Sequence, residues 1–160
     1  MLRLIRSIFV LLIFTVSIGG IVKYLTQATT ATEKPVVDPN LKEFVDDWQC
    51  DMKTANIDFL TGFNRISNIS LVAAENPYAG KTEYSTRSIK INRRQLESGY
   101  YRTRATVYHE LGHYVFKLEH GSCAIMQERC QSEEELKENW KEWINEYLQL
   151  CINNSLEAKY

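Results

Sequence analysis

The chain contains three histidines, and all of them fall between positions 109 and 120. Two of them flank a glutamate in His109-Glu110-Leu111-Gly112-His113, which is an HExxH motif. Residues four positions apart project from the same face of a helix, so His109 and His113 can converge on one metal ion. Two neutral imidazoles suit Zn²⁺, which accepts a tetrahedral site with one open position. Glu110 lies beside that face and can act as general base for a metal-activated water. The motif therefore indicates zinc-dependent peptide-bond hydrolysis.

A catalytic zinc site needs a third protein ligand, and we favour His120 because three histidines form a known zinc arrangement. To bring it to the metal, the chain must leave the helix after His113 and turn back. Carboxylates are the alternatives, one beside His120 and four on the last helix: Glu119, Glu133, Glu134, Glu138 and Glu146.

The elements that must position these residues follow from hydrophobic periodicity. The pattern predicts helices over 39–54, 102–118 and 133–151, strands over 66–74 and 86–92, and a turn at Asn76-Pro77 with Gly80. Ser132 is the expected N-cap of the last helix. In the motif helix, an apolar face lies opposite the two histidines, so one face packs into the core and the other borders a cleft. We expect an α+β fold, with a small twisted sheet packed on an N-terminal helix and on the HExxH helix, followed by a C-terminal helix.

The N-terminus has the pattern of a membrane or signal segment. Arg3 and Arg6 precede residues 7–22, which carry no charge, and Lys23 follows. A cleaved signal peptide and a retained single-pass anchor both fit, and both place the rest of the chain outside the cytoplasmic membrane. We expect a signal or anchor over 1–25, a linker over 26–38 and a metallopeptidase domain over 39–160, either membrane-anchored or secreted (periplasmic).

Composition and cysteine content agree with this organisation. The 160 residues allow one domain, and a formal net charge of −1 gives no support to nucleic-acid binding. Four cysteines in an exported domain suggest two disulfides. The spacing suggests Cys123–Cys130 as a local loop and Cys50–Cys151 as a tie between the first and last helices, with free buried thiols as the alternative.

Residues 87–130 resemble the metzincin class of zinc peptidases, especially the small bacterial metzincin-like proteins. There, a short strand ending in IxIN or IxID precedes a HELGH helix, a third histidine follows, and a tight turn ends in IM. The matching segments are residues 89–92, 109–113, His120 and residues 124–126. The resemblance implies that Met126 forms the Met-turn, an apolar floor beneath the zinc. It also implies that Glu110 is the general base and that a sheet edge holds an extended peptide substrate.

The chain departs from that class at several positions. Phe116 stands where a glycine usually ends the helix, and His120 lies eleven residues after His109 instead of ten. We expect Lys117 or Glu119 to adopt the unusual backbone that absorbs this difference. Ala124 stands two residues before Met126, where the class usually has serine, and Glu128 stands two residues after it, where the class has tyrosine. Four other tyrosines could take the place of that tyrosine: Tyr100, Tyr101, Tyr108 and Tyr114.

Two other functions compete with a peptidase. A closed structural zinc site could be built from two histidines and two cysteines: His109, His113, Cys123 and Cys130. Alternatively, the chain is a membrane-anchored binding or assembly protein that keeps a relic site.

Overall fold

The computed structural model describes residues 34–129 and 131–157 of the chain. The elements in chain order are β1 (Val36–Val37), the 3₁₀ turn η1 (Pro39–Leu41), α2 (Lys42–Thr54), α3 (Leu60–Phe63), β2 (Asn68–Val72), β3 (Gly80–Glu83), β4 (Ser88–Asn92), α4 (Arg94–Ser98), α5 (Tyr100–Leu111), the π-helical turn η2 (Gly112–Phe116) and α6 (Glu133–Glu157). The described part of the chain is therefore α+β, as the sequence predicts.

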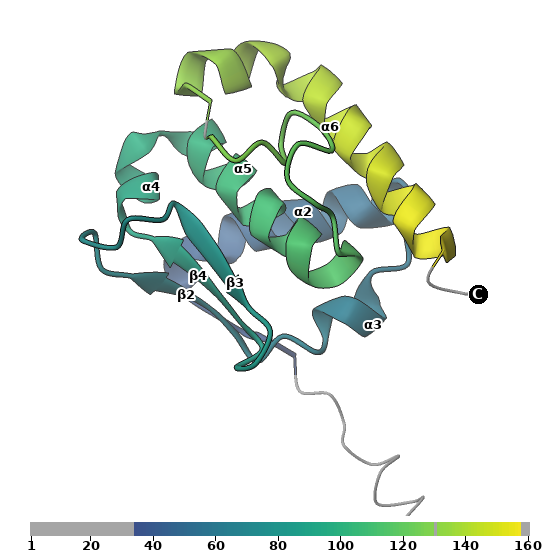
Figure 1. Ribbon diagram of the computed structural model, residues 1–160, viewed down its shortest axis with the longest axis horizontal. Helices are drawn as coiled ribbons and strands as arrows, with labels where there is room; N and C mark the ends of the chain where they lie inside the picture. The colour runs from purple at the N-terminus through teal and green to yellow at the C-terminus, as the bar shows by residue number, and fades with distance from the viewer. Residues whose placement is uncertain (1–33, 130, 158–160) are drawn as a thin grey trace, which may run out of the picture. The chain divides into compact units, whose positions relative to one another are not determined.

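The sheet has the strand order β1-β2-β4-β3 (Figure 1). β1, β2 and β4 are parallel, and β3 forms an antiparallel edge with Thr82 opposite Ile89. Ile69, Ile89 and Ile91 are buried, while Lys90 forms an ion pair with Glu83. Along β4, only Lys90 is not buried, because the polar ends Ser88 and Asn92 are buried together with the two isoleucines.

The three long helices α2, α5 and α6 join the sheet in a single hydrophobic core. Trp48 of α2 donates its indole N–H to the Tyr147 hydroxyl of α6 at 3.0 Å. The Tyr147 hydroxyl in turn donates to the Tyr108 carbonyl of α5 at 2.7 Å. All three side chains are fully buried, so these bonds satisfy polar atoms that burial would otherwise leave unpaired.

The ends of α5 and α6 are fixed by side chains. Ser132 accepts a hydrogen bond from the Glu135 backbone N–H at 3.1 Å, which confirms it as the N-cap of α6. The carboxylate of Glu133 accepts from the backbone N–H groups of Tyr101 and Arg102 at 3.1 and 2.8 Å. A residue from the start of α6 therefore caps the N-terminus of α5, the helix that carries the motif.

Several short elements differ from the sequence prediction. Residues 36–37, expected in the linker, pair with β2 as β1. Gly80, expected in a turn, begins the strand β3 (residues 80–83). The short helices α3 and α4 were not predicted. Each of these segments has five residues or fewer, which is too few to show periodicity, so only tertiary contacts define them.

The predicted Cys50–Cys151 disulfide is wrong. Cys50, Cys123 and Cys151 are free, with Cys50 exposed and the other two buried. Cys50 lies roughly 200° around α2 from the core residue Trp48, whereas Cys151 lies on the buried face of α6. Cys123 does not form the local disulfide either, and its expected partner Cys130 lies outside the described residues.

The expected N-terminal signal or anchor also lies outside the described residues. Within the described ranges, no helix is long and apolar enough to cross a membrane.

Candidate metal centre

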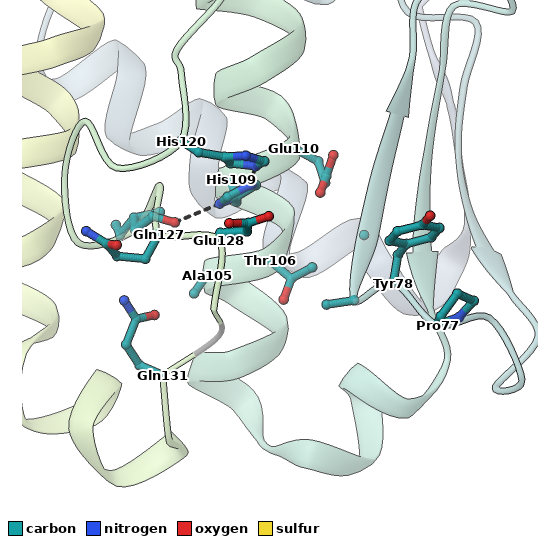
Figure 2. A pocket seen from close by; sticks show the side chains of 13 residues that line it. Pro77, Tyr78, Ala105, Thr106, His109, Glu110, His120, Gln127, Glu128 and Gln131 are labelled. Atoms are coloured by element: carbon teal, nitrogen blue, oxygen red, sulfur yellow. Dashed lines mark hydrogen bonds between the residues drawn. The ribbon is translucent and has the colours of Figure 1, made fainter.

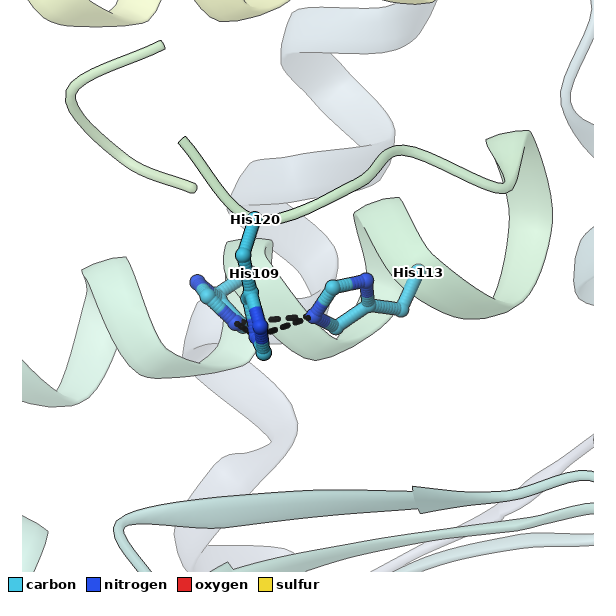
Figure 3. Close-up of side chains that lie close together, drawn as sticks. All are labelled: His109, His113 and His120. Carbon is cyan, nitrogen blue, oxygen red and sulfur yellow. Dashed lines mark hydrogen bonds between the residues drawn. The ribbon is translucent and has the colours of Figure 1, made fainter. Parts of the chain in front are cut away.

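The three histidines meet at one point beside the C-terminal end of α5 (Figure 3). The Nε2 atoms of His109 and His113 are 2.9 Å apart, and the Nε2 atom of His120 lies 3.0 and 3.1 Å from them. Among the described residues, this is the group of histidine, cysteine or acidic side chains that could hold a metal ion. Tetrahedral Zn²⁺, with Zn–N bonds of about 2.0–2.1 Å, holds its nitrogens about 3.3 Å apart, so only a small expansion of the triangle is needed.

Two backbone carbonyls orient the motif histidines. His109 Nδ1 lies 2.9 Å from the Ile125 carbonyl oxygen, and His113 Nδ1 lies 2.6 Å from that of Leu118. A carbonyl only accepts, so each Nδ1 carries the proton and each Nε2 presents a lone pair. Nε2 lone pairs that face each other at 2.9–3.1 Å repel unless a cation lies between them. Backbone carbonyls that accept from Nδ1 are also the usual outer-shell partners of metal-bound histidine.

Burial keeps these imidazoles neutral. It lowers the pKa of His109 to about 4, and it also lowers the pKa of His113. A neutral imidazole is the form that binds a metal, so the fold prepares both ligands at neutral pH.

His120 reaches the cluster because the helix ends in a wider turn. Residues 112–116 form the π-helical turn η2, and Lys117 adopts a left-handed backbone with φ 59°. The Leu118 N–H then returns to the Gly112 carbonyl at 3.3 Å. A π turn accommodates one extra residue, which explains how His120 reaches the cluster eleven positions after His109. The expectation that Lys117 or Glu119 takes the unusual backbone is confirmed at Lys117.

Two tyrosines fix this turn. Tyr84, just beyond β3, donates its hydroxyl to the His113 carbonyl at 2.7 Å and stacks on Tyr114 at a centroid distance of 5.6 Å. The Lys117 ammonium lies 4.0 Å from the Tyr84 ring centroid. The contacts tie the β3 end of the sheet to the turn that presents His113 and His120.

Glu110 is buried between α5 and the edge strand (Figure 2). Thr82 of β3 donates its hydroxyl to Glu110 Oε2 at 2.8 Å. A Cβ atom at Gly80 would lie 2.7 Å from Glu110 Oε1, so the strand can approach this carboxylate only with glycine there. Burial raises the pKa of Glu110 to about 7, and the Thr82 hydrogen bond opposes that shift. A carboxyl with a pKa near neutrality is suited to accept and return a proton.

Met126 packs against Gly112 of the motif. It is fully buried, and its Sδ is 3.0 Å from the position that a Cβ on Gly112 would occupy. Its N–H donates to the Cys123 carbonyl at 3.0 Å, and its carbonyl accepts from Gly121 at 2.9 Å, which closes a tight turn. Gly112, between the two motif histidines, is therefore the point where this turn packs against the start of η2.

The alternative ligands lie elsewhere. Glu133 caps α5, and the other carboxylates considered, Glu119, Glu134, Glu138 and Glu146, are exposed and stand outside the histidine group. Cys123 is also outside that group, and Cys130 is not among the described residues.

The four candidate tyrosines do not point to the metal centre. Tyr100 and Tyr108 donate to Asp47 and Asp51, Tyr114 donates to the Arg65 carbonyl, and Tyr101 packs on Trp140. Instead, Tyr78 borders the centre from the loop before β3. Sequence reasoning missed Tyr78, Thr82 and Gly80 because the edge strand was not predicted, and the Gly80-x-Thr82 alternation is the only local signal for it.

A cleft passes over the centre between α5 and β3. It consists of a cavity of about 470 Å³ toward the N-terminal half of α5 and another of about 310 Å³ toward His113 and Tyr84. Four residues line both cavities: Tyr78, Gly80, Glu110 and His120. The histidine cluster and Glu110 therefore lie where the two cavities meet.

Comparisons with protein-family models, with curated proteins and with solved structures found no match for this chain.

Proposed function

We propose that this protein is a zinc-dependent endopeptidase of metzincin-like type. The observation that carries the proposal is the convergence of three imidazole Nε2 atoms, 2.9–3.1 Å apart, beside a buried glutamate in an open cleft. His109, His113 and His120 would hold the zinc ion. When bound, zinc acts as a Lewis acid that polarises the substrate carbonyl and makes water acidic.

Glu110 is the general base of the proposed reaction. Thr82 engages Oε2, so Oε1 is the oxygen left to take a proton from the attacking water. The same carboxyl then returns that proton to the leaving amine nitrogen. Burial raises the pKa of Glu110 and so favours its holding the proton between the two transfers. Burial of Glu110 excludes bulk water that would compete for the proton.

The edge strand β3 is the proposed substrate platform. It lies at one end of the sheet order and borders both cavities through Gly80. An extended peptide can add to the free edge of such a strand through main-chain hydrogen bonds. Protein or peptide substrates fit this arrangement, and the resemblance to metzincins points to the same use of a sheet edge.

The proposed location is outside the cytoplasmic membrane. Arg3 and Arg6 precede the uncharged run of residues 7–22, which supports a signal peptide or single-pass anchor over 1–25. Because Val36 and Val37 pair with β2, the proposed linker ends before them and the peptidase domain includes them.

The test is to measure zinc content and peptide hydrolysis of the purified full chain and of its Glu110→Ala variant. We expect one zinc per chain in both, and loss of hydrolysis by at least about a hundredfold in the variant. Glu138→Ala, which removes an exposed glutamate of α6, is the matched control and should retain activity. Full hydrolysis by Glu110→Ala would contradict the mechanism. Zinc binding without hydrolysis by the wild type would favour a binding or assembly protein with a relic or structural site.

A further inference from the structure

The larger cavity beside the metal centre has a polar wall that the proposed mechanism does not use. It extends from His109 along α5 past Thr106 and Ala105, away from His113. The loop after Met126 forms one wall with Gln127, Glu128 and Gln131, and Pro77 and Tyr78 lie on the other side (Figure 2). Its volume of about 470 Å³ is large enough for a long side chain.

This wall offers hydrogen-bond acceptors. Glu128 contributes a carboxylate. The other acidic residue of the cavity lining is Glu110. Gln131 donates its Nε2 to the Ala124 carbonyl at 2.6 Å, so Oε1 is the amide atom left to accept from a ligand.

The lining also lacks a positive side chain. Among the described residues, no lysine or arginine lines this cavity, and Arg102, the next basic residue along that face of α5, lies a full turn before Thr106. Among the three loop residues that form this wall, Glu128 is therefore the charged one.

These features match one class of side chain. The aliphatic stem of a lysine or arginine can lie against Ala105 and Ile125 while its cationic end reaches the carboxylate of Glu128. An acidic side chain against the same wall would face Glu128 with no lysine or arginine of the lining beside it, and like charges at close range repel.

We propose that this cavity binds a lysine or arginine side chain of the substrate next to the bond that is cut, and that Glu128 determines this preference. The inference rests on the proposed function, because it assigns a substrate class to the same site. Glu128 is exposed, so the preference has the size of one partly screened ion pair.

The test uses fluorogenic peptides that are identical except for a lysine, leucine or glutamate on either side of the scissile bond. We expect the wild-type full chain to cleave the best lysine peptide with a kcat/KM about fivefold above that of its glutamate counterpart at low salt. Glu128→Gln should remove this difference, and Glu128→Lys should reverse it. Glu134→Gln, which neutralises an exposed glutamate outside the cavity, should leave it unchanged.

Equal rates for lysine and glutamate peptides, or an unchanged preference in Glu128→Lys, would overturn the assignment. A separate measurement distinguishes this failure from failure of the proposed function. Peptide affinity is measured by fluorescence anisotropy on the zinc-loaded full chain, with the same Glu128 variants. If no peptide is cleaved but the lysine peptide binds more tightly through Glu128, the cavity assignment stands and the peptidase proposal fails. If binding shows no preference, the cavity assignment fails as well.

Discussion

Thr82 Oγ1 lies 2.8 Å from Glu110 Oε2 and 3.1 Å from the Glu110 carbonyl oxygen. One hydroxyl of the edge strand thus contacts both the side chain and the backbone of the proposed general base. Because the hydroxyl has a single proton, the two oxygens share it, and the carboxylate is held against β3. The strand that borders the cleft is therefore also the element that positions the base.

We expect Thr82→Val to lower kcat by about tenfold or more, because it removes a hydrogen bond to a charged group while the side-chain volume hardly changes. Thr82→Ser keeps the hydroxyl and should retain most of the activity. Zinc content should equal that of the wild type in both, since Thr82 does not contact the histidines. A wild-type kcat in Thr82→Val would show that Glu110 needs no partner on β3.

His120→Ala should weaken zinc binding by roughly a hundredfold or more, since about 10–16 kcal/mol is spread over the ligands of a typical site. The measurement is competition with a chromophoric chelator. Glu119→Ala removes the neighbouring carboxylate, which stands outside the histidine group, and should bind zinc like the wild type. If Glu119→Ala weakened zinc binding and His120→Ala did not, Glu119 would be the third ligand.

Glu133→Ala should lower the free energy of unfolding by about 1 kcal/mol, because the backbone N–H groups of Tyr101 and Arg102 lose their cap. Urea denaturation measures this change. Glu134→Ala removes the next charge in the same first turn of α6 and should have a much smaller effect. Equal losses in the two variants would assign the effect to the α6 dipole and not to the capping of α5.

The free thiols should differ in reactivity. Burial raises the pKa of both Cys123 and Cys151, so at any given pH less of each is present as the reactive thiolate. In a Cys130→Ser background under native conditions, a maleimide should label Cys50 quickly and the other two only after unfolding. If Cys50 resisted labelling until a reductant was added, that result would contradict the free thiols and indicate a Cys50–Cys151 disulfide.

Local patterns were sufficient for the main helices. The apolar spacing of α2 and α6 and the capping by Ser132 follow from neighbours within four residues, and the structure confirms them. The edge strand β3 was not predictable in this way. Its four residues pair with β4 and contact α5, and neither relationship leaves a period in so short a segment.

The cysteines show the same limit. Spacing along the chain suggested pairs, but the side of α2 on which Cys50 lies separates it from the core where Cys151 is buried. Pairing depends on side-chain direction in three dimensions, which distance in sequence does not encode.

The sequence by itself determined that His109 and His113 share one helix face with Glu110 beside them, because helical geometry fixes the relation of residues four apart. Only the tertiary structure decided that His120 joins them and that Thr82 and Gly80 enclose the base. His120 depends on a π turn and on the left-handed backbone of Lys117, and Thr82 depends on where a strand nearly thirty residues away along the chain docks. Such non-local contacts arise from packing of the whole core, so no local rule specifies them.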